Sequence, residues 1–402
     1  MYITANRPPG RALLRSVPAN VLALGMVSMV TDISAEMVTA VLPLYLVLAL
    51  GLNPLQIGVL DGLHFGVTAL VRLAGAHASD RWRHRKLVAA SGYGLSALAK
   101  LGLLLAGTSV GALGTVITAD RAGKGLRTAP RDAMISLSTP PDRLGQAFGV
   151  HRAMDTLGAF LGPLAAFGVL AATGGSYDAV FMTSFCVAAL GLVLLALYVR
   201  DPRTTTLAAE PPRIGTAVRA IAGDPAFRRI CAVTVLLSLV TVSDFFVYLL
   251  LQKQLAMTPG LFPLLPLGTA AVYLLLAVPL GRLADRRGRV GVFLGGHVAL
   301  LAAYLLLAGA ATGIALLIAV LVLHGTFYAA TDGVLMSAAG PLLPEALLTS
   351  GMAVLQTAQA LARLGSSVAF GALWTAWDAR TGLLVMAGGL ALPLLAARKV
   401  IL

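Results

Sequence analysis

Long apolar stretches, each followed by a short polar one, run along almost the whole of this 402-residue chain. A helix that crosses a membrane needs about 20 mostly apolar residues. Twelve stretches approach or exceed that length, and we expect one spanning helix in each. Their ranges are 18–50, 55–78, 87–107, 111–136, 145–172, 177–199, 228–255, 261–283, 290–310, 312–339, 346–375 and 380–398. The pattern predicts an all-α integral membrane protein of about twelve transmembrane helices.

A polar stretch divides these twelve segments into two sets of six. Gly281–Arg289 follows the eighth segment, and the related Ala76–Arg85 follows the second. Two related six-helix halves are typical of secondary transporters. We therefore expect a first six-helix bundle over 1–199, a cytoplasmic linker over 200–227 and a second six-helix bundle over 228–402.

Composition and the placement of charge agree with this interpretation. Hydrophobic residues make up 58% of the chain and charged residues 12%, against about 25% charged in soluble domains. Basic residues gather in alternate loops and in the linker, which is the positive-inside pattern. We expect a multi-pass protein of the cell (inner) membrane with both termini in the cytoplasm. The net charge of +13 then reflects topology, and nucleic-acid binding is not expected.

Several other classes of protein receive no support from the sequence. No cleavable leader is expected, because the polar segment Met1–Pro18 runs directly into the first apolar stretch. Cys186 and Cys231 lie in separate apolar stretches and predict neither a disulfide nor a metal site. The chain has no phosphate-binding loop, metal-ligand cluster or nucleophile–base pair, so we expect no cofactor and no enzymatic activity.

Charged residues inside the predicted helices are the candidates for function, because each is costly within a bilayer. In the first half they lie on the first, fourth and fifth segments. Candidates for proton coupling are Asp32, Glu36, Arg121, Asp155 and His151, and four of the candidates for substrate binding are Asp32, Glu36, Arg121 and Lys124. Arg127 and Arg131 lie nearer the end of the fourth segment, and we expect them to extend to the membrane surface.

Two interpretations of these charges remain open. The acidic and basic residues can neutralise one another as inert scaffolding, because buried pairs add little net stability. They can also form a switch, in which a solute or a proton breaks one pair and makes another.

The second half has fewer charges, and its polar side chains recur at helical spacing. Such groups with aromatic neighbours suit either a central solute site or hydrogen bonds between helices. The candidates for substrate binding here are Asp244, Tyr248, Tyr328, Asp332, Gln356, Gln359 and Arg363.

Four motifs together resemble those of the major facilitator superfamily. The loop motif is complete from Gly281 to Arg289, whereas Ala76 and Arg83 replace two of its positions in the first copy. Arg121-x-x-x-Gly125 resembles the buried-arginine motif of that superfamily. The glycines of the fifth segment resemble the motif of its twelve-helix, proton-coupled efflux branch, the drug:proton antiporters. This helix-packing motif comprises Gly149, Gly158, Gly162 and Pro163.

The resemblance implies a conformational latch in the two loop motifs, formed in one access state. Its residues would be Asp80, Arg81 and Arg85 in the first copy and Gly281, Asp285, Arg286, Gly288 and Arg289 in the second. It further implies a secondary active transporter that exports a small solute against protons by alternating access, in the lipid bilayer and as a monomer. A symporter or exchanger of a charged metabolite, metal chelate or siderophore is the first alternative. A non-transporting sensor or assembly partner is the second.

Overall fold

The computed structural model of the chain describes residues 17–82, 84–140, 143–202, 224–343 and 348–401. Side chains are described for these residues except 72–82, 348–350 and 396–401. The described part is helical throughout and contains no β-strand, which confirms the all-α prediction.

The helices of the first half follow the predicted segments closely. They are α2 (Ala19–Leu44), its π-helical continuation η1 (Tyr45–Ala49), α3 (Pro54–Trp82), α4 (Arg85–Leu105), α5 (Val110–Leu137), α6 (Leu144–Ala172) and α7 (Tyr177–Tyr198). The second half comprises α9 (Pro225–Leu239), α10 (Asp244–Gln254), η3 (Pro259–Leu264), α11 (Leu265–Arg287), α12 (Arg289–Ala308), α13 (Ile314–Ala339), η4 (Gly340–Leu342), α14 (Leu348–Ala376) and α15 (Ala379–Ile401).

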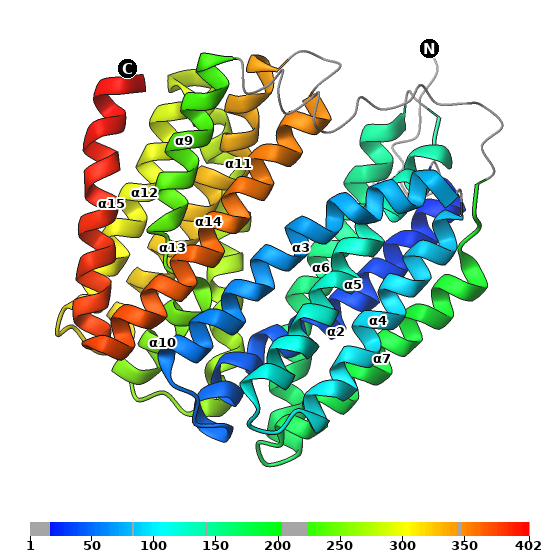
Figure 1. Cartoon of the computed structure of the whole chain (residues 1–402), viewed down its shortest axis with the longest axis horizontal. Coiled ribbons are helices and arrows are strands. Elements are labelled where there is room, and N and C mark those ends of the chain that lie inside the picture. Colours follow the sequence, from blue (N-terminus) through cyan, green and yellow to red (C-terminus); the bar gives the residue numbers. More distant parts are fainter. Residues whose placement is uncertain (1–16, 83, 141–142, 203–223, 344–347, 402) are drawn as a thin grey trace, which may run out of the picture.

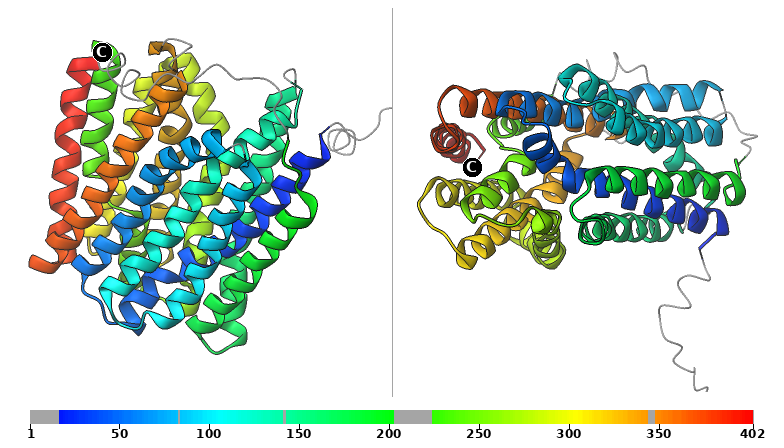
Figure 2. Two further views of the ribbon diagram at one scale, coloured as in Figure 1. Left: turned by 45° about the vertical axis from the view of Figure 1, so that its right-hand side comes forward. Right: turned by 90° about the horizontal axis from the view of Figure 1, so that it is seen from below.

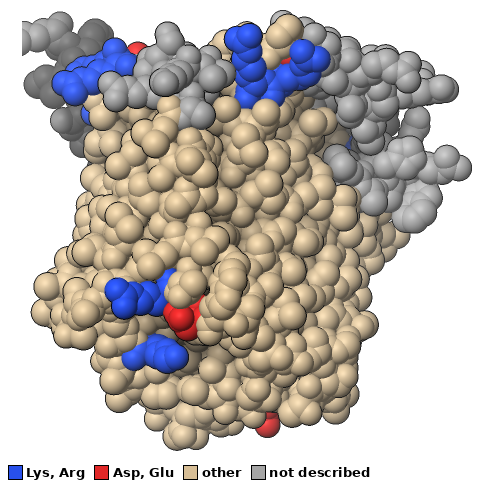
Figure 3. Space-filling view, turned by 60° about the vertical axis from the view of Figure 1, so that its left-hand side comes forward, with Lys and Arg blue, Asp and Glu red and all other residues tan. Residues whose placement is uncertain are grey.

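These helices have the length and surface of membrane spans. Within the described residues, nine spans are long and apolar enough to cross a bilayer. α5 is not among them, because it carries Asp120, Arg121, Lys124 and Arg127 near its middle. One lateral face of the molecule shows a broad band without charged side chains (Figure 3). The chain is therefore a multi-pass membrane protein.

The helices form two groups, α2–α7 and α9–α15 (Figure 1). α2 begins and α15 ends on the same side of the molecule, which we call the termini side. The opposite, far side carries the connection between α2 and α3 at residues 50–53. The two groups stand next to each other, and the helices of both run between the termini side and the far side. Two further views show the same arrangement (Figure 2).

α3 and α14 meet in a tight seam between the two groups. The seam lies on the far side, since α3 begins there and α14 ends there. A Cβ at Gly58 would collide with the backbone carbonyl of Ser367, and one at Gly371 with that of Pro54. The Leu55 amide also donates a hydrogen bond to Thr375 Oγ1 (2.9 Å). Glycine lets the two backbones approach closely, so the halves are in direct contact on the far side.

The seventh predicted segment is broken into α9 and α10 at residues 240–243. The freed backbone groups find side-chain partners. Tyr304 Oη accepts from the Val242 amide (2.6 Å), and Ser366 Oγ donates to the Thr241 carbonyl (2.8 Å). Such satisfaction allows irregular backbone inside a membrane. Discontinuous helices often form the solute sites of transporters.

Candidate functional site

A cavity of about 380 Å³ lies between the two halves. Its wall comes from α2, η1, α3 and α6 of the first half and from α10, η3, α11 and α13 of the second. Four carboxyl groups line it, those of Glu36, Asp61, Asp244 and Asp332. Its aromatic lining consists of Phe65, Phe245, Tyr248, Phe262, Tyr273 and Tyr328. We call this space the central cavity.

A second cavity of about 310 Å³ lies between α3, α5 and α14. Its charged lining is basic, with Arg121 and Lys124 from α5, and Gln356 lies on the opposite wall. His64 and Phe65 line both cavities. We call this second cavity the basic cavity. It reaches further towards the termini side than the seam does. The halves are therefore packed together at the seam, the central cavity lies beside it, and the basic cavity lies between the halves nearer the termini side.

Asp244 is the centre of a hydrogen-bonded group in the second half. It stands at the first residue of α10, directly after the break. His324 Nε2 donates to its Oδ1 over 3.2 Å, and Tyr328 Oη donates to the same oxygen over 2.6 Å. His324 is buried, and its ring stands edge-on to that of Tyr248 (5.9 Å). The structure thus brings together three predicted substrate residues: Asp244, Tyr248 and Tyr328.

The other predicted residues of the second half are dispersed. Asp332 lines the central cavity, and Gln356 lines the basic one. The Arg363 guanidinium lies about 6 Å from the rings of both Phe65 and Tyr328, one from each half. Gln359 lies on α14 and lines neither cavity among the described residues.

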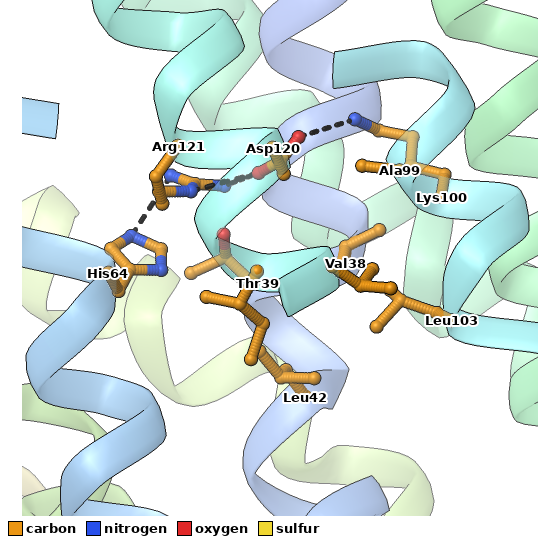
Figure 4. Close-up of a pocket in the computed structure, with 11 residues that line it drawn as sticks. Val38, Thr39, Leu42, His64, Ala99, Lys100, Leu103, Asp120 and Arg121 are labelled. Carbon is orange, nitrogen blue, oxygen red and sulfur yellow. Dashed lines mark hydrogen bonds and ion pairs between the residues drawn. The ribbon is translucent and has the colours of Figure 1, made fainter. Parts of the chain in front are cut away.

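A row of polar groups connects α4, α5 and α3 in the first half (Figure 4). Lys100 Nζ lies 3.2 Å from Asp120 Oδ1, and Arg121 Nε donates to Asp120 Oδ2 over 2.8 Å. Arg121 Nη1 in turn donates to His64 Nε2 (3.0 Å). Lys100 and Arg121 are both buried. The contacts with Asp120 and His64 hold Arg121 at the wall of the basic cavity.

A second buried group joins α2, α5 and α6. Arg127 Nη2 donates to Asp32 Oδ1 (3.3 Å), and its guanidinium lies 4.5 Å from the centre of the Tyr93 ring. Arg131 Nη1 donates to Ser28 Oγ (3.0 Å) and lies 3.8 Å from Asp155 Oδ1.

The expectation that Arg127 and Arg131 extend to the membrane surface is therefore wrong. Arg127 is 3% exposed and Arg131 6%. The reason is that Asp32 and Asp155, from two other helices, supply carboxylates inside the bundle. Asp132, next to Arg131 in the chain, adds a third pairing at 3.1 Å.

Three polar candidates are not engaged in the same way. Among the described residues, Glu36 and Lys124 form no ion pair or hydrogen bond, although each lines a cavity. His151 is 1% exposed, and neither of its ring nitrogens has a hydrogen-bond partner in the described part of the chain. The side chains of Glu36, Lys124 and His151 are therefore available to pair with a bound solute or a proton.

The glycines of α6 divide into two kinds. A Cβ at Gly158 would collide with the Met29 carbonyl, and one at Gly162 with Glu36 and the Ile33 carbonyl. Both positions let α6 lie directly against α2, and Pro163 follows at the central cavity. Gly149 faces open space and takes no part in this contact.

The loop motifs lie at the termini side. In the second copy, Arg289 Nη2 lies 3.6 Å from Asp285 Oδ1, and Arg289 Nη1 donates to the Ser337 carbonyl (2.7 Å). These contacts stay within the second half. Gly288 has φ of 101°, a conformation that favours glycine. In the first copy, the side chains of Asp80 and Arg81 lie outside the described residues, whereas Arg85 begins α4.

Sequence reasoning missed Asp61, His64 and Lys100. Asp61 is 7% exposed and accepts a hydrogen bond from Ser367 Oγ across the seam. His64 lines both the central cavity and the basic cavity and is hydrogen-bonded to Arg121. Each is a charged or polar residue within a predicted helix, and that alone would have marked it as a candidate.

Comparison with known proteins agrees with this architecture. Residues 24–363 match the family model described as Major Facilitator Superfamily. The chain belongs to this superfamily. It is 28% identical over 376 residues to an uncharacterized MFS-type transporter of Methanocaldococcus jannaschii, covering 90% of this chain and 89% of that one. An uncharacterized protein of Mycobacterium tuberculosis is 32% identical over 157 residues, 39% of this chain and 38% of its own.

Solved structures share the superfamily fold with this transporter. The nucleoside transporter NupG superposes with a TM-score of 0.78 at 15% identity, covering 94% of this chain and 98% of that one. A bacterial homolog of the human lysosomal transporter Spinster, inward-facing and unoccupied, gives 0.76 at 16% identity over 98% of both chains. The family match over residues 24–363 and the archaeal relative make the protein an MFS-type transporter and not an enzyme.

Proposed function

We propose that this protein exports a small solute in exchange for protons by alternating access. The first bundle (1–199) and the second (228–402) would rock about the central cavity. The observation that carries the proposal is the asymmetry between the packed glycine seam on the far side and the basic cavity, which lies between the halves nearer the termini side. With both termini in the cytoplasm of a cell (inner) membrane, the basic cavity would open inward.

Glu36 and Asp32 are the proposed proton carriers. Glu36 is the better placed of the two, because it faces the central cavity without a partner among the described residues. Asp32 is already paired with Arg127, so its release would need that contact to break. Arg121, Asp155 and His151 would tune the carriers through their charges. The transporter would work as a monomer.

The loop motifs would latch the two halves together when the far side opens. Asp285 is now paired within its own half and is exposed at its side chain, which leaves it accessible to the first half after rocking. The seam between α3 and α14 would part in the same movement.

Proton coupling can be tested in proteoliposomes that enclose a pH-sensitive dye. A solute panel, chosen by thermal shift at two pH values, is added outside and proton movement is recorded. We expect the double variant Asp32→Asn/Glu36→Gln, shown by gel filtration to be folded, to lose solute-driven proton movement, and the exposed Asp378→Asn to keep it. Undiminished coupling in the double variant would refute the assignment.

A symporter of a charged metabolite is the second candidate, favoured by the many charges that line the cavities. The same recording separates the two, because solute entering by exchange drives protons out of the vesicle. Solute entering by symport carries protons in.

A further inference from the structure

Two adjoining cavities present unpaired charges of opposite sign. Glu36 and Asp332 line the central cavity, and Lys124 lines the basic cavity. Within the described part of the chain, these three side chains form no ion pair or hydrogen bond. Most other interior charges of the first half are paired at distances between 2.8 and 3.8 Å. The unpaired charges are therefore concentrated where a solute would lie.

The two cavities adjoin at one part of their walls. His64 and Phe65 form part of each wall, so the cavities meet at these residues. The carboxylate of Asp32 lies near Lys124, but Arg127 already donates to it. Lys124 is thus left with free donors towards the basic cavity.

The central cavity also suits an ammonium group. No lysine or arginine among the described residues lines it, and the rings of Tyr248, Tyr273 and Phe245 line it together with its carboxylates. Aromatic faces attract ammonium groups, more strongly where water is excluded. The same rings provide apolar contact for the body of a solute.

We propose that the transported solute is a small zwitterion that carries an ammonium and a carboxylate group. The ammonium lies by Glu36 and Asp332 in the central cavity, and the carboxylate reaches Lys124 in the basic cavity. This assignment rests on the proposed transport function. A simple cation would leave Lys124 unpaired inside the membrane, and a simple anion would leave Glu36 and Asp332 unpaired. A neutral solute would leave all three unpaired, and unpaired charges are costly there.

Binding of charge-matched probes tests this inference. One set is L-leucine, 3-methylbutylamine, 4-methylpentanoate and 3-methylbutanol. The other is L-tyrosine, tyramine, 3-(4-hydroxyphenyl)propanoate and tyrosol. Thermal shift and calorimetry of the purified full chain measure affinity. The zwitterion of at least one set should bind more tightly than its three relatives.

Two variants test which side chain binds the carboxylate of the solute and which binds its ammonium group. Lys124→Gln should weaken binding of the zwitterion by about tenfold or more and leave the amine probe unchanged, because a charged hydrogen bond is lost. Glu36→Gln should weaken the zwitterion similarly and leave the carboxylate probe unchanged. Arg229→Gln, at an exposed position of α9, is the matched control and should change neither. Melting of each variant without probe checks that it is folded.

The inference is overturned if a singly charged or neutral probe binds more tightly than its zwitterion, or if no probe of either set binds. It is also overturned if both variants weaken neutral probes as much as zwitterions. Zwitterion binding without flux in proteoliposomes would refute the transport proposal and keep the class of ligand. Flux of a neutral solute without zwitterion binding would refute the class of ligand and keep the transport proposal.

Discussion

At the scale of single residues, the interior of the first half is organised by pairs of opposite charge. The identity of many of these residues could be predicted, since Asp32, Arg121, Lys124 and Asp155 are conspicuous within apolar helices. Their partners could not be predicted. Asp32 meets Arg127 across 95 positions of sequence, and helical spacing within one segment says nothing about a neighbouring helix.

Removing one member of the Asp32–Arg127 pair should destabilise the protein strongly. Asp32→Asn leaves the Arg127 guanidinium buried without a countercharge, which costs about 3–5 kcal/mol. We expect a clearly lower apparent melting temperature in detergent. The double variant Asp32→Asn/Arg127→Met should recover part of the loss.

The exposed pair Asp285–Arg289 provides the control. Its side chains are 66% and 39% exposed, and such pairs contribute about 0–1 kcal/mol. Asp285→Asn should therefore leave the melting temperature nearly unchanged. Equal losses from the buried and exposed pairs would contradict the assigned contacts.

At the scale of helices, the apolar pattern was sufficient to place twelve segments, and their ends agree with the structure to within a few residues. It did not predict the break between α9 and α10. Residues 240–243 contain no glycine or proline, so nothing local marks the interruption. The break depends on Tyr304 and Ser366, which come from helices much later in the chain.

Tyr304→Phe should weaken the break between α9 and α10. The buried Val242 amide would lose its acceptor, and an unsatisfied buried group costs about 1–3 kcal/mol. We expect a lower melting temperature and weaker solute binding, because Asp244 follows the break directly. Tyr198→Phe, exposed at the end of α7, is the control. An unchanged melting temperature in Tyr304→Phe would show that another group satisfies the backbone.

The contact between α2 and α6 can be tested with two equivalent glycine substitutions. Gly158→Val would drive a side chain into the Met29 carbonyl and force the helices apart. Gly149→Val meets open space on the same helix. We expect poor yield of folded Gly158→Val, judged by gel filtration in detergent, and near-normal yield of Gly149→Val. The reverse order would show that α6 packs through a different face.

At the scale of the whole molecule, the seam and the cavities define one access state. The sequence predicted two related halves but could not say which side is closed. That depends on the approach of α3 and α14, whose residues are more than 300 positions apart. Glycines on both helices allow the approach, but glycine is common throughout this chain and does not mark the contact.

A disulfide across the seam should hold the far side shut. After replacement of Cys186 and Cys231 by serine, Leu55→Cys and Thr375→Cys place two thiols at a contact that now joins Leu55 N to Thr375 Oγ1. Oxidation should protect both thiols from maleimide and abolish flux, with solute binding retained. Either single variant should keep flux under the same oxidant. Full flux in the cross-linked protein would show that the seam need not part.

The pairing of charges within the first half has a consequence for energetics in a living membrane. Lys100, Arg121, Arg127 and Arg131 are matched there by Asp32, Asp120, Asp132 and Asp155. A charge that crosses the membrane potential gains or loses about 2.3 kcal/mol per 100 mV. Four positive and four negative groups moving together cancel that work. These paired groups should therefore add no voltage dependence to the return of the empty carrier. Any difference in its rate between polarised and unpolarised vesicles would come from the unpaired side chains of Glu36, Asp332 and Lys124.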